Sequence, residues 1–313
     1  MTQFPKALPI PEQIFDRRSK RHQEVLTAAK LGVFFRFSVI LIEVVGIFLM
    51  NSSALFLDVI SSLMDIASSL LLIFCIKLAQ RPPDRNHPFG HGRYEPLGGM
   101  LLGIFLVVLG SSMFGQQFLR MFHETGDSHI HPWSWLFPAF AMGMLEIAYR
   151  NLNQAAKEQN SPALAADAVH YRIDSLTSLF ATIALLLAGF WPEWALHIDH
   201  AGALVIALFM IVIGVIASRE NFHQLMDRVP DNHFFDRVRQ AAFKATGVEG
   251  TEKIRIQQYG PDAHVDIDIE VKPTLSVEKA HEISQQVRLE IQLAWPSVRD
   301  VTVHIEPYYA NDH

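Results

Sequence analysis

The chain has 313 residues, of which 50% are hydrophobic and 19% are charged, and its formal net charge at pH 7 is −6. Soluble proteins carry about 25% charged residues, so this composition argues against an ordinary soluble protein. The negative charge and the lack of a basic stripe argue against a nucleic-acid partner. A single cysteine, Cys75, excludes a disulfide framework.

Six apolar segments in the first two thirds of the chain predict membrane-spanning helices, each of which needs about 20 mostly apolar residues. The fourth segment is short, and the second and fifth contain acidic residues. In chain order the segments are 31–50, 54–79, 97–118, 133–149, 163–190 and 201–218.

Basic residues gather in alternate connections between these segments. The second connection holds Arg81, Arg85 and Arg93, the fourth holds Arg150 and Lys157, and the stretch before the first segment is also basic. Cytoplasmic loops carry the excess of lysine and arginine. We therefore expect both termini in the cytoplasm, and the inner membrane of a bacterial cell as the location.

From about residue 230 the pattern changes to that of a small globular domain. Helical and alternating segments follow in the order α-β-β-α-β, which predicts an open-sheet α+β domain with its helices on one face. The predicted elements are 232–245, 251–259, 263–271, 276–293 and 301–306, with a hairpin turn at 260–262. The fold predicted is thus an all-α bundle of six membrane helices (31–228) between an N-terminal arm (1–30) and a cytoplasmic α+β domain (229–313).

Ionisable residues lie inside two of the membrane segments, where each charge costs at least about 2.5–3.5 kcal/mol to insert. Asp65 is in the second segment, and His170 and Asp174 are one helical turn apart in the fifth. One imidazole and two carboxylates suit zinc, iron or manganese. The alternative is that these groups form structural ion pairs with each other, with Arg36 or with Arg172.

Two further positions of the second segment share the face of Asp65. Ser61, one turn earlier, offers a hydroxyl ligand or leaves its place to water, and Asp58 is a possible extra ligand nearer the outer side. A second candidate cluster, Asp84, His87 and His91, falls within eight residues of a cytoplasmic loop. One carboxylate and two histidines at this spacing are able to wrap one ion, although a solvated turn before a helix remains the alternative.

Acidic and histidine side chains also line one face of the predicted sheet in the tail. By itself such a face is usually only solvated, and metal binding is the other interpretation. The face comprises His264, Asp266, Asp268 and Glu270 on one strand and His304 and Glu306 on the last, with His281 at the exposed side of the second tail helix.

Together these patterns resemble the cation diffusion facilitator family of divalent-metal/proton antiporters. The resemblance covers most of the chain and implies six spans, cytoplasmic ends and a ferredoxin- or metallochaperone-like αββαβ tail. It is carried by Ser61-Ser62-Leu63-Met64-Asp65, Asp84, Asn86-His87, Gly90-His91-Gly92, Ala166-Asp167-Ala168-Val169-His170-Tyr171, Asp174 and Leu225-Met226-Asp227-Arg228.

The resemblance also implies a role for particular residues. The transport site uses the second and fifth spans, and Ser61 stands where the family usually has an acid, so that Asp58 or water would complete the shell. Asp84, His87 and His91 correspond to a second metal site, and Arg93 and Asp227 to an interlocking charge pair. The tail ligands implied are Glu252, Asp268, His281, His304 and Glu306.

The function expected is export of a divalent cation in exchange for protons by alternating access. Zinc is the first expectation and iron the second, with manganese, cadmium and cobalt as further cargo. Metal would also be a structural or regulatory ligand of the tail, which is expected to mediate a homodimer. One alternative is a non-transporting, metal-sensing membrane partner. An intramembrane metal hydrolase is the other, but the sequence has no His-Glu-x-x-His motif, and neither an enzyme nor a catalytic residue is expected.

Overall fold

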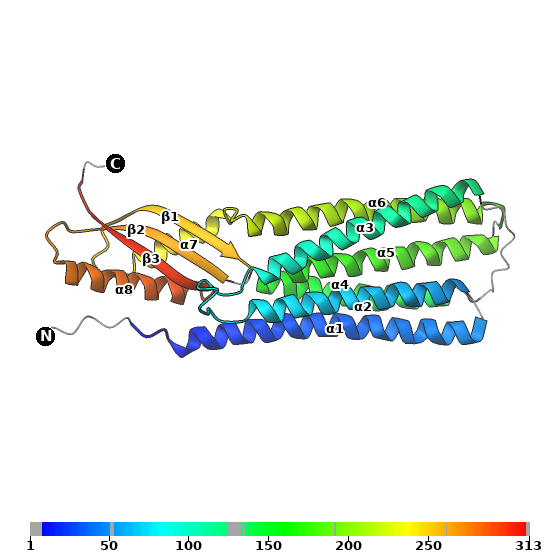
Figure 1. The fold of residues 1–313 in the computed structure, drawn as a ribbon, viewed down its shortest axis with the longest axis horizontal. Coiled ribbons are helices and arrows are strands. Elements are labelled where there is room, and N and C mark those ends of the chain that lie inside the picture. The colour runs from blue at the N-terminus through cyan, green and yellow to red at the C-terminus, as the bar shows by residue number, and fades with distance from the viewer. Residues whose placement is uncertain are drawn as a thin grey trace. The chain divides into compact units, whose positions relative to one another are not determined.

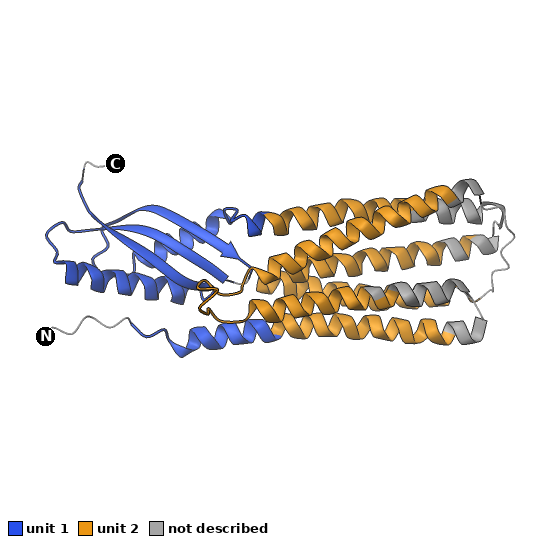
Figure 2. Cartoon of the chain, viewed as in Figure 1, with its two compact units in different colours: residues 1–23, 223–313 blue, residues 24–222 orange. Residues whose placement is uncertain are grey.

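The structure is a computed structural model that describes residues 8–50, 53–123, 133, 135–190, 192–260 and 262–310. Within these ranges the side chains at 46–50, 53–61, 64, 120–123, 162, 184–185, 188–190, 192–203 and 206 lie outside the description. The chain divides into two compact units, residues 24–222 and residues 1–23 with 223–313 (Figure 2). The arm predicted at 1–30 is therefore shared between the two units.

Long helices account for residues 12–225 apart from their connections (Figure 1). They extend beyond the predicted apolar segments, most clearly in α1, which begins at Glu12 rather than near residue 31. Among the described residues, Glu12–Val45 and Tyr94–Leu119 are long and apolar enough to cross a membrane. The helices are α1 (Glu12–Met50), α2 (Ser53–Ala79), α3 (Tyr94–His123), α4 (Leu136–Gln159), α5 (Pro162–Phe190) and α6 (Pro192–Leu225).

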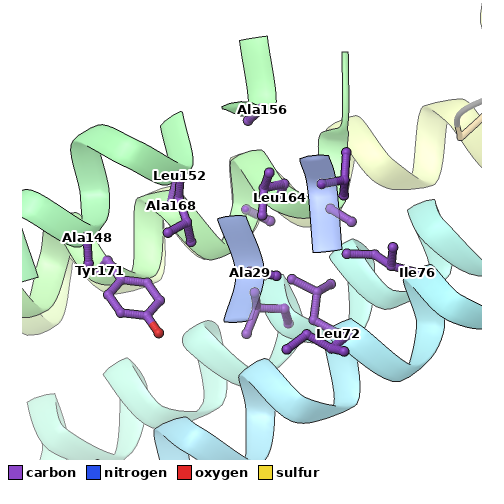
Figure 3. Packing of buried hydrophobic residues seen from close by; sticks show 14 of the residues in the cluster. Ala29, Leu72, Ile76, Ala148, Leu152, Ala156, Leu164, Ala168 and Tyr171 are labelled. Carbon is purple, nitrogen blue, oxygen red and sulfur yellow. The ribbon is translucent and has the colours of Figure 1, made fainter. Parts of the chain in front are cut away.

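The core of the helical unit is made where α1, α2, α4 and α5 meet (Figure 3). Leu72 and Ile76 of α2 face Ala29 of α1, while Leu152 of α4 and Tyr171 of α5 are fully buried nearby. Alanines on α4 and α5 keep the side chains between these helices short, so their backbones can approach closely. This packing brings the polar positions of α2 and α5 toward each other.

Glycines allow the backbones of α3 and α6 to approach each other closely. A Cβ atom at Gly103 would lie 2.4 Å from Ser218 Oγ and 2.9 Å from the carbonyl oxygen of Gly214, and a Cβ at Gly214 would lie 2.8 Å from the carbonyl oxygen of Gly103. Close approach through small residues is the usual way in which membrane helices associate. α3 in turn contacts both α2 and α5, so it encloses the polar positions from a third side.

The tail confirms the predicted order of elements, α-β-β-α-β. The sheet order is β1-β2-β3, with β1 antiparallel to β2 and β2 parallel to β3. The hairpin between β1 and β2 turns at Gly260, whose φ of +58° suits glycine, and Ser276 Oγ caps α8 by accepting from the backbone N–H of Lys279 at 3.2 Å. The elements are α7 (Asn232–Ala242), β1 (Gly250–Tyr259), β2 (Asp262–Val271), α8 (Val277–Ala294) and β3 (Val298–Pro307).

The two faces of the tail sheet differ in chemistry. Val265, Ile267 and Ile269 of β2 are fully buried in the core shared with α7 and α8. The alternate residues of β2 lie on the opposite face, where the parallel register sets Asp268 beside His304 of β3. The predicted polar face is thus present, and it brings side chains from two strands together.

The first turns of α1 belong to the same unit as the tail. Arg18 donates from Nε to the carbonyl oxygen of Pro296 at 2.6 Å and from Nη2 to that of Val298 at 2.8 Å. These two carbonyls precede or open β3, so the guanidinium satisfies backbone groups at the start of an edge strand. These two hydrogen bonds connect the first turns of α1 to the tail.

Candidate metal site

The predicted intramembrane ligands of α2 and α5 come together. His170 Nε2 lies 3.3 Å from Asp65 Oδ1 and 3.6 Å from Asp174 Oδ2, and one donor atom from each residue lies within 4.8 Å of the others. Asp65 is 8% exposed and His170 is fully buried. The helical spacing of four places His170 and Asp174 on one face, and the packing of α2 against α5 supplies Asp65. We call these three residues the membrane cluster.

Arg36 of α1 is a fourth member of this site. Its Nη1 lies 2.5 Å from Asp65 Oδ2, its Nη2 donates to Asp174 Oδ2, and its guanidinium carbon lies 4.4 Å from the centre of the Tyr171 ring. Arg36 is 2% exposed. The structural ion pair considered from the sequence is therefore present, with Arg36 as the partner of both carboxylates.

Arg172, the other arginine considered, pairs elsewhere. It donates to Glu146 of α4, whose other carboxylate oxygen accepts from Arg150 Nε at 2.9 Å. This pair joins α5 to α4. The positive charge beside the membrane cluster therefore comes from α1.

A further carboxylate lies close by in sequence, one turn before His170 on α5. Asp167 is fully buried, and its Oδ1 accepts a hydrogen bond from Ser69 Oγ of α2 at 3.0 Å. Its Oδ2 is buried without a hydrogen-bond partner among the described residues. The sequence placed Asp167 in a motif but assigned it no role, although its spacing of three from His170 was the available signal.

Two candidate ligands cannot be placed. Ser61 and Asp58 belong to α2, but their side chains lie outside the described residues. Their participation in the membrane cluster stays a prediction.

The loop between α2 and α3 folds around Asp84. Asp84 Oδ1 accepts from the backbone N–H groups of Asn86 and His87 at 2.9 and 2.8 Å and lies 3.3 Å from His87 Nδ1. Asp84 Oδ2 lies 3.4 Å from His91 Nε2. The backbone N–H of His87, and after it that of Asn86, lowers the pKa of Asp84 because both stabilise the ionised carboxylate. The three side chains form the loop cluster, which is more exposed than the membrane cluster.

The third group, the tail cluster, lies on the polar face of the sheet. His304 Nδ1 is 3.7 Å from Asp268 Oδ1 and 3.2 Å from Glu306 Oε1, and the His304 side chain is 66% exposed. Glu252 and His281, also predicted as tail ligands, do not fall in any of the three groups that the described residues form. His281 Nε2 instead lies 3.3 Å from Gln285 Nε2, one turn along α8.

The predicted interlock of Arg93 and Asp227 concerns residues of different units. Arg93 lies in the unit of residues 24–222 and Asp227 in the unit of the tail. Asp227 follows α6 with a φ of +56°, and its N–H donates to the carbonyl of Gln224 at 3.2 Å. The interlock stays a prediction.

Comparison with known families accounts for nearly the whole chain. Residues 29–226 match the model described as the cation efflux transmembrane domain, and residues 230–308 match the cytoplasmic domain of cation efflux proteins. The chain belongs to the cation diffusion facilitator family. It is accordingly a membrane-embedded protein that functions in divalent cation efflux.

Individual members of the family are similar at moderate identity. The manganese efflux system protein MneP of Bacillus subtilis is 28% identical over 264 residues, covering 83% of this chain and 88% of its own. The cation-efflux pump FieF of Serratia proteamaculans is 27% identical over 296 residues, covering 90% and 93%. Metal tolerance protein C1 of Arabidopsis thaliana is 27% identical over 276 residues, covering 84% of this chain and 58% of its own.

Among solved structures, a cadmium form of MamM CTD is 27% identical and covers 25% of this chain and 98% of that chain, with a TM-score of 0.25.

Proposed function

We propose that this chain is a secondary transporter that exports a divalent metal ion from the cytoplasm in exchange for protons. The observation that carries the proposal is the convergence of Asp65, His170 and Asp174 inside the helical unit. Buried ionisable groups on membrane helices are costly and mark ion pathways. The family places the chain among cation efflux proteins, and the membrane cluster is a group of three possible ligands among the described residues of its helices, two of them buried.

Exchange for protons follows from the chemistry of the ligands. Carboxylates and imidazole bind a metal only when they are deprotonated, so a metal ion and protons compete for the same atoms. If the cluster opens alternately to the two sides, protons that enter from outside replace the departing metal. The inward proton gradient would then drive export.

Zinc is the proposed cargo, with iron close behind. One imidazole and two carboxylates form a site of intermediate softness that accepts Zn²⁺, Fe²⁺ and Mn²⁺, with Cd²⁺ and Co²⁺ as further ions. The buried His170 favours zinc or iron over manganese, whereas the name of MneP refers to manganese efflux. The identity of the transported metal is therefore best tested by measuring uptake of a panel of divalent ions.

The proposed topology has six spans, α1 to α6, with both termini in the cytoplasm and the bacterial inner membrane as the location. The proposed assembly is a homodimer formed through the tail. The polar sheet face supports this, because a metal ion at the tail cluster would neutralise acidic groups that otherwise repel a second copy. No enzymatic reaction is assigned to the chain.

Transport by the membrane cluster is tested in proteoliposomes. We expect His170→Ala and Asp174→Asn to reduce uptake of Zn²⁺ to the level of empty vesicles, with and without a pH gradient. His233→Ala, which removes an exposed histidine of α7, is the matched control and is expected to transport normally. Wild-type flux in both cluster variants would refute the assignment.

A second candidate function is favoured by Arg36 and Ser61. A guanidinium between the two carboxylates, together with a serine where the family usually has an acid, suits a metal-sensing partner that does not transport. Such a protein would bind metal at the tail but show no flux for any ion of the panel.

A further inference from the structure

Arg36 uses the same carboxylate oxygens that a metal ion would need. It contacts Oδ2 of Asp65 and Oδ2 of Asp174, and Oδ1 of Asp65 faces His170. One guanidinium thus spans both acidic members of the membrane cluster from a third helix. A divalent ion placed among the same donors would meet a permanent positive charge in a buried environment, where like charges repel far more strongly than in water.

We propose that Arg36 is a tethered cation that competes with the transported metal for Asp65 and Asp174. The inference rests on the proposed function, because it takes the membrane cluster as the ion-binding site. Metal binds as the guanidinium leaves the two carboxylates. After protons have replaced the metal, the guanidinium returns to the carboxylates when those protons leave. Arg36 therefore sets the apparent affinity of the site without being one of its ligands.

The surroundings of Arg36 suit a side chain that can be displaced. Its Nε is buried and has no hydrogen-bond partner among the described residues, so the guanidinium is held by its two terminal nitrogens and by the Tyr171 ring. The arginine side chain has several rotatable bonds, and an aromatic face attracts a cation without fixing its direction. A carboxylate as buried as that of Asp65, in contrast, is stabilised by a positive partner.

Competition has a signature that distinguishes it from a change in the ligands. Displacing Arg36 costs the same for every metal, so its removal should strengthen the binding of all divalent ions by one common factor. A change in ligand geometry would instead affect Zn²⁺ and Mn²⁺ differently, since their preferences for imidazole differ. A purely structural clamp predicts no gain in affinity for either ion.

The experiment measures Zn²⁺ and Mn²⁺ affinity of the purified full chain in detergent by competition with a fluorescent chelator. All proteins carry His87→Ala and His304→Ala to weaken the loop and tail clusters. We expect Arg36→Gln to bind both ions about tenfold more tightly, or by a larger shared factor. Arg172→Gln is the matched control, because it removes an arginine of α5 that pairs with Glu146 outside the membrane cluster, and it should leave both affinities unchanged.

Unchanged or weaker binding by Arg36→Gln, or gains that differ between the two ions, would overturn the inference. If that variant does not fold, Arg36→Lys decides, because one ammonium cannot donate to two carboxylates as a planar guanidinium does. A shared, smaller gain supports competition, and no gain overturns it. Absence of flux in the wild type would refute transport alone, because the affinity gain is measured without flux.

Discussion

The membrane cluster and the tail cluster contain the same donor types in different surroundings. Each combines one histidine with two carboxylates whose donor atoms lie within 4.8 Å of one another. Asp65 and His170 are buried and Arg36 contacts both acids, whereas His304 is largely exposed on a sheet face. The comparison separates the effect of burial from that of ligand chemistry.

Burial makes the charge of Asp65 costly to leave uncompensated. Removing the partner of a buried carboxylate is strongly destabilising, so a guanidinium, a proton or a metal ion stabilises Asp65, whereas the Asp174 side chain is 20% exposed. The tail cluster faces water, which solvates its carboxylates whether or not an ion is bound. Under the proposed function, we expect the membrane cluster to couple ion binding to helix rearrangement and the tail cluster to bind ions more weakly.

The strongest test of this contrast makes the same Asp→Asn change in each cluster. Asp65→Asn removes one of the two ionic contacts of Arg36 in a buried site, and we expect a loss of unfolding free energy on the order of 2 kcal/mol. Asp268→Asn changes a partly exposed acid whose neighbour His304 is 66% exposed, and it is expected to stay within about 0.5 kcal/mol of the wild type. Thermal unfolding of the full chain in detergent, without added metal, measures both effects.

The matched control is Asp236→Asn, which alters an exposed acid of α7 outside all three clusters. Equal destabilisation by the Asp65 and Asp268 substitutions would show that burial does not separate the two sites.

Residue spacing within the sequence predicts much of this architecture. Alternation with a period of two located β2, and the glycine at position 260 located its hairpin with β1. His170 and Asp174 share a helix face by spacing alone, and the loop cluster closes within eight residues. These features depend on neighbours in the sequence, which is why the sequence suffices for them.

Features that depend on tertiary packing are harder to predict from the sequence. The sequence offers Arg36 as one possible partner of these acids, but its contact with both carboxylates depends on how α1 packs against α2 and α5. The role of Glu252 as a ligand rests on the family resemblance, and the pairing of β1 with β2 is irregular between Thr251 and Ile254. A strand with such an irregularity does not keep its alternation, so the face of a residue inside it cannot be predicted from sequence.

A smaller effect is expected from adding an acid to each cluster. Ser61→Asp places a carboxylate one helical turn before Asp65, which should offset Arg36 and strengthen Zn²⁺ binding about tenfold, or about 1.4 kcal/mol. Thr302→Asp adds an acid on the tail face two residues before His304, where solvent weakens each charge. We expect less than about a threefold gain there, since exposed pairs contribute at most about 1 kcal/mol.

Chelator competition on the full chain measures both gains, each in a background that removes the histidine of the other cluster. A larger gain from Thr302→Asp than from Ser61→Asp would reverse the proposed order of electrostatic strength between the buried and exposed sites.

The smallest expected difference concerns salt. The Debye length shrinks from about 10 Å at 0.1 M to about 3 Å at 1 M ionic strength, which weakens interactions between exposed charges much more than those between buried ones. Raising sodium nitrate over this range should weaken Zn²⁺ binding several-fold in a His170→Ala protein, where the tail cluster dominates, and less than about twofold in a His304→Ala protein. His87→Ala in both backgrounds weakens the loop cluster equally. An equal loss of Zn²⁺ affinity in the two proteins would mean that water and ions screen Asp65 and Asp174 as strongly as they screen the tail cluster. Arg36 would then compete only weakly with a metal ion for these two acids.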